Sequence, residues 1–223
     1  MVASINGVSS APTPGKAKAR NAATVVVEPI ARFLLAARIS PNAVTVIGAL
    51  GAVVTAVVCF PSGRLVAGAI GVVVFALLDL LDGAMARMAQ RESVWGAFLD
   101  SVLDRVVDAA VFGALAVWFF RGGDDPVLGC VVLYCLMAGG VISYARARAE
   151  GLGLDARGGI AERTERLLIA MIATGLSGLG VPYIQAVGLW VLAGLTTVTI
   201  IQRMVKVHRQ TQSAAATNLS GPA

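Results

Sequence analysis

Aspartates gather in one stretch of this chain, inside segments that are otherwise apolar. Five of the thirteen acidic residues are aspartates between positions 79 and 108, namely Asp79, Asp82, Asp100, Asp104 and Asp108. The i,i+3 spacing of the first pair and the i,i+4 spacing of Asp100 and Asp104 place each pair on one face of a helix. Carboxylates within an apolar helix are costly to bury and mark functional sites.

Oxygen-only side chains of this kind favour a particular chemistry. Carboxylates select hard divalent cations such as Mg²⁺, Mn²⁺ or Ca²⁺ over zinc, and two such ions together clamp a phosphoryl group. The alternative is a set of structural ion pairs with Arg87, Arg91 and Arg105. Three cations do not neutralise five acids on one stripe, so we expect a metal site.

The elements that must position these aspartates are membrane helices. The chain has 223 residues, of which 57% are hydrophobic and only 14% charged, whereas about a quarter of a soluble domain is charged. Residues 39–63 and 167–202 carry no charge at all. This pattern excludes an ordinary soluble domain and a disordered chain, and the three cysteines are too few for a disulfide scaffold. The sequence predicts an integral membrane protein.

The predicted fold class is all-α, with six transmembrane helices preceded by an interfacial amphipathic helix. The expected organisation is a mobile N-terminal tail over 1–21, the amphipathic helix over 22–39, a six-helix transmembrane catalytic domain over 40–207 and a mobile C-terminal tail over 208–223. Pro41 suits a first helical turn. Clusters of Gly, Pro and polar residues separate the spans, which are predicted at 42–60, 65–87, 94–120, 126–147, 162–180 and 183–204.

Positive charge is distributed unevenly about these spans. An even number of spans places both termini on one side, and that side collects 15 of the 18 Lys and Arg residues, whereas Arg64 and Arg121 lie opposite. By the positive-inside rule, the protein lies in the cell membrane with both termini and the acidic site cytoplasmic. The net charge of +5 suits an anionic lipid surface. Because aromatics make up only 6% of the chain, stacking platforms are scarce and no nucleic-acid partner is expected.

The aspartates and their neighbours form one longer pattern. Asp79 and Asp82-Gly83 are followed by Ala86-Arg87, Gly96, Asp100 and Asp104 at fixed spacings. This pattern resembles the signature of the CDP-alcohol phosphotransferases at every defined position, and the resemblance extends over all six spans and the preceding helix. Such enzymes use an alcohol hydroxyl to displace CMP from a CDP-linked lipid.

The resemblance implies a role for each matching residue. Two divalent cations, Mg²⁺ or alternatively Mn²⁺, would be held by Asp79, Asp82, Asp100 and Asp104. Asp104 would also be the catalytic base that takes the proton of the acceptor hydroxyl. The CDP portion would be bound by Pro41, Asn42, Thr45, Gly83 and Arg87. The resemblance also implies that this protein forms a homodimer.

The aspartate signature does not identify the alcohol that accepts the phosphatidyl group. A second cluster, made mainly of arginines, indicates which alcohol it is. Residues 143–166 resemble a branch of the family, the bacterial phosphatidylinositol-phosphate synthases, which join CDP-diacylglycerol and inositol phosphate. This resemblance implies acceptor-phosphate ligands at Ser143, Arg146, Arg163, Arg203 and Lys206. For any single arginine, positive-inside topology and snorkelling at the interface are the better explanation, and only the cluster as a whole favours a pocket for a phosphorylated acceptor. The alternative acceptor is glycerol phosphate, which would give phosphatidylglycerol phosphate.

A transporter is the alternative from a different functional class, since ion-coupled transporters also carry intramembrane carboxylates. A transporter needs a polar path to the opposite side of the membrane. The outer halves of the six predicted spans carry almost no polar residues. We therefore expect an enzyme.

Overall fold

The structure is a computed structural model that describes residues 27–89 and 93–219, without the side chains of residues 79, 80 and 214–219. Every regular element in these ranges is a helix. A first helix covers residues 27–36. Six longer helices follow: α2 Pro41–Cys59, α3 Leu65–Met88, α4 Val94–Arg121, α5 Pro126–Glu150, α6 Arg163–Gly178 and α7 Ile184–Leu219.

Polar caps begin three of these helices. The Ser40 hydroxyl accepts a hydrogen bond from the backbone N–H of Ala43 at 3.2 Å, and Pro41 occupies the first turn of α2 as predicted. Asp125 caps α5 in the same way. Ser93 caps α4 by accepting from the backbone N–H of Gly96 at 2.9 Å. The cap fixes where the acidic helix α4 starts, and hence the height of its aspartates.

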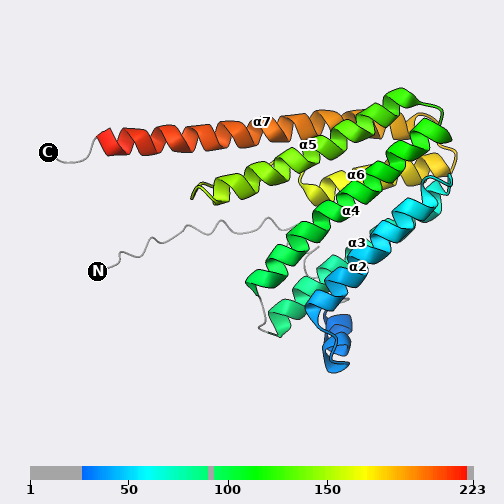
Figure 1. The fold of residues 1–223 in the computed structure, drawn as a ribbon, viewed down its shortest axis with the longest axis horizontal. Helices are drawn as coiled ribbons and strands as arrows, with labels where there is room; N and C mark the ends of the chain where they lie inside the picture. The colour runs from blue at the N-terminus through cyan, green and yellow to red at the C-terminus, as the bar shows by residue number, and fades with distance from the viewer. Residues whose placement is uncertain (1–26, 90–92, 220–223) are drawn as a thin grey trace, which may run out of the picture.

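The six helices lie side by side as a bundle (Figure 1), and each packs on two neighbours, so that they form a closed ring. In order around this ring, α3 packs on α2, α2 on α4, α4 on α5, α5 on α7, α7 on α6, and α6 on α3. Helix α2 packs against both acidic helices, α3 and α4, so α2 sets their relative position.

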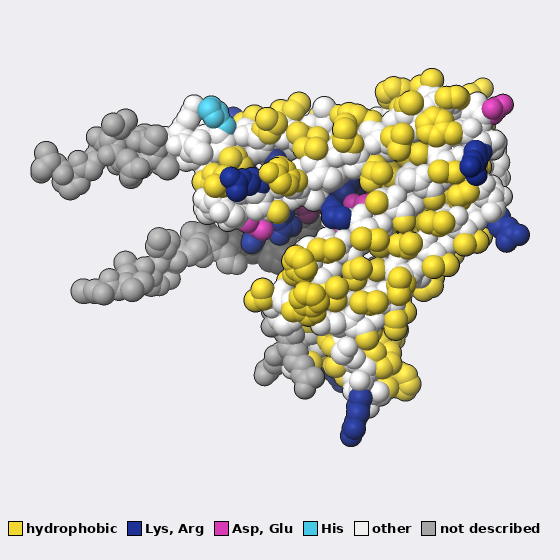
Figure 2. Space-filling view, viewed as in Figure 1, with side chains coloured by type: hydrophobic (Ala, Val, Ile, Leu, Met, Phe, Trp, Pro, Cys, Tyr) yellow, Lys and Arg dark blue, Asp and Glu magenta, His cyan; other side chains and the backbone are white. Residues whose placement is uncertain are grey.

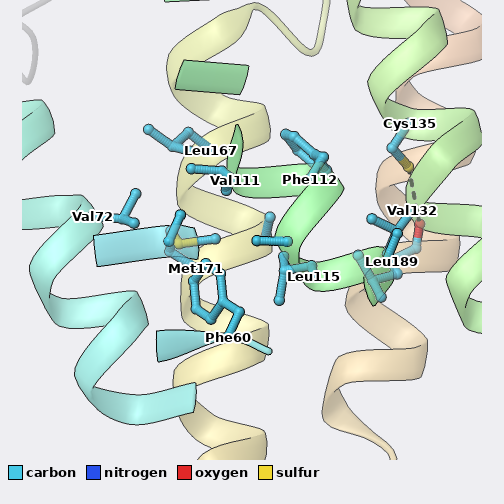
Figure 3. Close-up of a cluster of buried hydrophobic side chains, with 14 of the residues drawn as sticks. Phe60, Val72, Val111, Phe112, Leu115, Val132, Cys135, Leu167, Met171 and Leu189 are labelled. Atoms are coloured by element: carbon cyan, nitrogen blue, oxygen red, sulfur yellow. Dashed lines mark hydrogen bonds between the residues drawn. The ribbon is translucent and has the colours of Figure 1, made fainter. Parts of the chain in front are cut away.

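Apolar side chains fill the interior of the ring. Phe60, Leu115 and Leu189 are fully buried, and Met171 of α6 packs among them (Figure 3). The face that α2 turns inward is made of alanines, which allow its neighbours to approach closely. The outer surface is apolar too, and hydrophobic side chains cover most of the face in Figure 2. Such a surface suits lipid rather than water.

Within the described residues, four helices have the length and hydropathy of a membrane span: α2, α3, α5 and the Ile184–Ser213 part of α7. Helix α4 has 28 residues but carries the charged groups of the acidic stretch. Helix α6 has only 16 residues, or about 24 Å, against a hydrocarbon thickness of ~30 Å. An all-helical chain with several spans is confirmed, whereas the number six remains a prediction.

The ends of the chain differ in part from the sequence prediction. Helix α7 continues to Leu219, although a span ending at 204 and a mobile tail from 208 were expected. No Gly or Pro interrupts residues 205–219, so the helix has no stop signal there. The predicted tail 1–21 lies outside the described residues. The helix at 27–36 packs Ala31 against Leu81 and Met85 of α3.

Candidate active site

A cavity of about 810 Å³ opens at the end of the bundle where α4 and α6 begin and α5 ends. Its walls carry acidic and basic groups, and Figure 2 shows such groups inside a hollow between α4 and α5. Helix α4 contributes Asp100, Asp104, Arg105 and Asp108. The other walls contribute Ser143 and Arg146 of α5, Arg163 and Arg166 of α6, and Arg203 of α7. A space of this size can hold a small charged ligand.

The predicted base, Asp104, lies on the wall of this cavity. Its side chain is 19% exposed, and its Oδ1 lies 2.8 Å from Nη1 of Arg163. Arg105 lies farther away, with Nη2 3.8 Å from Oδ2 of Asp104. The carboxylate therefore faces both the cavity and the start of α6, within reach of a ligand.

Asp82 lies on the other acidic helix and is buried. The hydroxyl of Thr45, on α2, donates a hydrogen bond to Oδ2 of Asp82. Thr45 and Asp104 both line a second, small cavity of about 20 Å³, room for roughly one water molecule. Thr45 of α2 is therefore bonded to the carboxylate of α3 and lies at the same small cavity as the carboxylate of α4.

The remaining residues predicted for CDP lie near the start of α2 and the end of α3. A Cβ on Gly96 would lie 3.2 Å from Oδ1 of Asn42, so the absent side chain lets α4 approach the start of α2. Arg87 is exposed, and its Nη1 lies 3.5 Å from the place of a Cβ on Gly83. Pro41 begins α2 on the same side.

Four of the five predicted acceptor-phosphate ligands line the large cavity, namely Ser143, Arg146, Arg163 and Arg203. The Ser143 hydroxyl accepts a hydrogen bond from Arg105. Arg203 is 4% exposed and donates to the carbonyl oxygens of Ile142 at 2.6 Å and Gly158 at 3.1 Å.

Lys206 is placed differently. Its Nζ lies 2.7 Å from Oδ2 of Asp155 and donates to the carbonyl oxygen of Arg157 at 2.9 Å. Among the residues that the structure describes, Lys206 is not part of the cavity wall. In this structure Lys206 holds the α5–α6 loop against α7.

Five charged residues of the cavity wall were not among the predicted ligands: Arg105, Asp108, Glu150, Glu162 and Arg166. Helical periodicity was the signal that could have found two of them. Asp108 continues the i,i+4 stripe of Asp100 and Asp104, and Arg166 follows Arg163 at i+3.

The side chains fit a hard divalent cation by their chemistry. Asp82, Asp100 and Asp104 offer oxygen donors alone, the set that Mg²⁺ and Mn²⁺ prefer. Within the described part of the chain, no three Asp, Glu, His or Cys residues lie close enough together to hold an ion. The fourth predicted ligand, Asp79, lies outside the described side chains.

Most residues of this site lie within a region that matches a known protein family. The family model of the CDP-alcohol phosphatidyltransferases matches residues 38–201. The chain belongs to this family. The matched region of this phosphatidyltransferase runs from the start of α2 into α7 and includes every aspartate of the signature.

Its relatives within the family include named enzymes. The phosphatidylinositol phosphate synthase of Streptomyces avermitilis is 45% identical over 221 residues, which cover 94% of this chain and 91% of the relative. That of Corynebacterium glutamicum is 40% identical over 187 residues, covering 83% and 85%. The chain is therefore an enzyme of phospholipid biosynthesis.

Solved structures of the same family share the fold. The crystal structure of the Mycobacterium tuberculosis phosphatidylinositol phosphate synthase with CDP-DAG bound matches with a TM-score of 0.78 and 42% identity, covering 82% of this chain and 93% of that chain. A second structure of that enzyme, in complex with manganese and citrate, matches with the same TM-score over 88% of its length. The helical bundle described above therefore has the fold of these phosphatidyltransferases, which are membrane enzymes.

Proposed function

We propose that this chain transfers the phosphatidyl group of CDP-diacylglycerol to a hydroxyl of inositol phosphate, which gives phosphatidylinositol phosphate and CMP. The observation that carries the proposal is the arginine-lined cavity beside Asp104. A phosphorylated acceptor requires several cations next to the reacting hydroxyl, and this cavity offers them. The names of relatives at 40–45% identity agree with this acceptor.

Asp104 is the base of the proposed reaction. It takes the proton of the acceptor hydroxyl, and the freed oxygen attacks the phosphorus of the phosphatidyl group. A new P–O bond forms to inositol phosphate, while the bond to the bridging oxygen breaks and CMP leaves with that oxygen. Two Mg²⁺ or Mn²⁺ ions, held by Asp79, Asp82, Asp100 and Asp104, would neutralise the charge that develops on CMP.

The CDP portion is bound where α2, α3 and α4 meet. Thr45 lies beside Asp82 through its hydrogen bond, and Gly96 leaves room next to Asn42. At the end of α3, the exposed guanidinium of Arg87 supplies a cation for the pyrophosphate. Pro41 and Gly83 complete this part of the proposed site.

The acceptor phosphate is bound in the large cavity, beside Asp104. Arg146, Arg163 and Arg203 surround it, with Ser143 as a further hydrogen-bond partner. Lys206 is the fifth proposed ligand, and it also bonds to Asp155 of the α5–α6 loop. A phosphate in this position leaves the hydroxyls of the acceptor free to reach Asp104.

The same proposal includes the arrangement in the membrane. Six spans cross the bilayer, the helix at 27–36 lies in the interface, and both termini and the active site face the cytoplasm. Most described cations lie at the end of the bundle that carries the large cavity, and Arg64 and Arg121 lie at the start of α3 and the end of α4. By family resemblance the chain acts as a homodimer.

The test is release of CMP by the purified full-length chain in lipid nanodiscs with CDP-diacylglycerol and Mg²⁺. We expect release when inositol phosphate is added. Release with glycerol phosphate alone would favour a phosphatidylglycerol phosphate synthase instead. Absence of release with either acceptor would contradict the proposal.

A further inference from the structure

Asp108 is a buried carboxylate that has no part in the chemistry proposed above. It lies one turn beyond Asp104 on α4, and its side chain is 8% exposed. Three arginines surround it. The nearest nitrogens lie at 3.5 Å for Arg105 Nη2, 3.4 Å for Arg163 Nε and 2.9 Å for Arg166 Nη2.

Arg166 is held from two sides. Its side chain is only 2% exposed, and the carboxylate of Asp108 accepts from its Nη2. On the other side, a Cβ on Gly139 would lie 3.0 Å from Cζ of Arg166, so the guanidinium lies directly on the backbone of α5. The guanidinium therefore has little freedom to turn, and Asp108 is the charge that orients it.

Arg163 is shared between two carboxylates. Its Nε lies against Asp108, and its Nη1 lies 2.8 Å from Asp104. A guanidinium has five N–H donors in a fixed plane, so fixing one edge also fixes the direction of the remaining donors. Both Arg163 and Arg166 line the large cavity. Asp108 thus orients two cations on one wall of the proposed acceptor site.

We infer that Asp108 is a positioning residue for the acceptor phosphate: it holds the guanidinium groups of Arg163 and Arg166 at the cavity wall where that phosphate binds. The inference rests on the proposed function. Arginine stays charged in a protein, so without Asp108 the buried Arg166 would lose its carboxylate partner. Asp104 would be the carboxylate left beside Arg105 and Arg163. The three guanidinium groups would then repel one another and turn apart. Asp108 also repels the phosphate, but it is needed first to assemble the arginines.

The test compares Asp108→Asn with the unaltered chain, as full-length protein in nanodiscs with CDP-diacylglycerol and Mg²⁺. We expect the KM for inositol phosphate to rise by about tenfold or more, the usual effect of losing a partner that orients a ligand-binding group. The KM for CDP-diacylglycerol should stay within about twofold. The matched control is Asp125→Asn at the other end of α5, where asparagine caps a helix as well as aspartate does.

A second variant and a double variant make the test specific. Asp108→Glu keeps the charge but displaces it, so its acceptor KM should lie between those of the unaltered chain and Asp108→Asn. If Asp108 acts through arginine, Asp108→Asn should raise KM less in an Arg166→Gln background than alone. A merely structural role would instead raise both KM values together, and additive effects would also overturn the inference.

The remaining outcomes separate this inference from the function on which it rests. No CMP release by the unaltered chain with inositol phosphate would overturn the proposed function. An active unaltered chain whose acceptor KM is unchanged in both Asp108 variants would overturn the positioning role alone. An acceptor KM that falls in Asp108→Asn would do the same, because the carboxylate would then act only by repelling the phosphate.

Discussion

At the scale of single residues, the site combines one half-buried carboxylate with a group of fixed cations. Asp104 lies on the cavity wall with Arg163 at 2.8 Å, and four further arginines, from α4, α5, α6 and α7, line the same space. In the proposed reaction, the acceptor needs a base for its hydroxyl and cations for its phosphate. Substitutions can separate the two roles, because each alters a different kinetic constant.

Asp104→Asn should reduce turnover by at least about 100-fold, because an amide cannot accept the proton of the acceptor hydroxyl. Binding of CDP-diacylglycerol should persist, since the amide oxygen remains available as a weak ligand. Both are measurable in nanodiscs, by CMP release and by calorimetric titration. Near-normal turnover would remove Asp104 from the role of base.

Arg146→Gln and Arg163→Gln should each raise the KM for inositol phosphate about 10- to 100-fold, because each removes a charge-assisted hydrogen bond to the phosphate. Arg148→Gln is the control. It lies on the same helix as Arg146 but, of the residues described, is not part of the cavity wall. If all three variants behave alike under steady-state kinetics, these arginines serve only membrane topology.

At the scale of elements, the α5–α6 loop is attached to α7. Lys206 and Gln210 of α7 bond to Asp155 of the loop, and Arg203 donates to Gly158 farther along. Thr199 accepts from the backbone N–H of Ala161 at 3.0 Å. These bonds place the loop, and with it the start of α6 where Arg163 lies.

The attachment should depend on pH. The hydrogen bond from Lys206, with a second from the backbone N–H of Arg157, lowers the pKa of the Asp155 carboxyl below its ordinary value. The folded pKa is then lower than the unfolded value of about 3.9. The bond therefore contributes stability fully above that unfolded value and loses it as the pH falls through the folded pKa.

Asp155→Asn should consequently lower the melting temperature at pH 7 by only about 1–2 °C, because this pair is exposed to solvent. The difference between the two proteins should vanish at a pH well below 3.9. Thermal unfolding followed by tryptophan fluorescence in detergent at both pH values tests this. A difference that persists in acid would show that the carboxylate acts through something other than its charge.

At the scale of the whole molecule, the ring of helices brings together groups that no single helix could hold. The aspartates lie on α3 and α4, which both pack against α2. Arginines of the cavity come from α5, α6 and α7, which complete the ring. The ring surrounds an apolar core that extends through the remainder of the bundle (Figure 3). A charged site at one end of an apolar bundle suits a reaction at the membrane surface.

Removal of divalent metal should abolish turnover, because the aspartates of the signature would repel one another and the pyrophosphate without it. Treatment with EDTA should stop CMP release, and added Mg²⁺ or Mn²⁺ should restore it. Zn²⁺ is the comparison ion, and it should restore less, since the site offers no sulfur or imidazole ligand. Full turnover after chelation would contradict the two-metal proposal.

Much of this protein followed from patterns that are local in sequence. Uncharged runs such as 167–202 predicted membrane helices, and the spacing from Asp79 to Asp104 placed four carboxylates on helix faces. Hydropathy and helical periodicity need only neighbouring residues, so they can be recognised without a structure. The start of α2 followed for the same reason, because a proline acts within one turn.

The order of helices and the membership of the acceptor cavity depended on packing between distant segments. Asp108 and Arg166 are 58 residues apart yet form one buried pair, and nothing in either local sequence specifies that contact. Lys206 is a predicted phosphate ligand by the resemblance, and the contact with Asp155, 51 residues away, was not foreseen from the sequence. The charge and spacing of a side chain can be read along the chain, whereas its partner is chosen by which helix faces pack together. That choice is made by the alanine and glycine surfaces of the ring, where close approach of two backbones is possible.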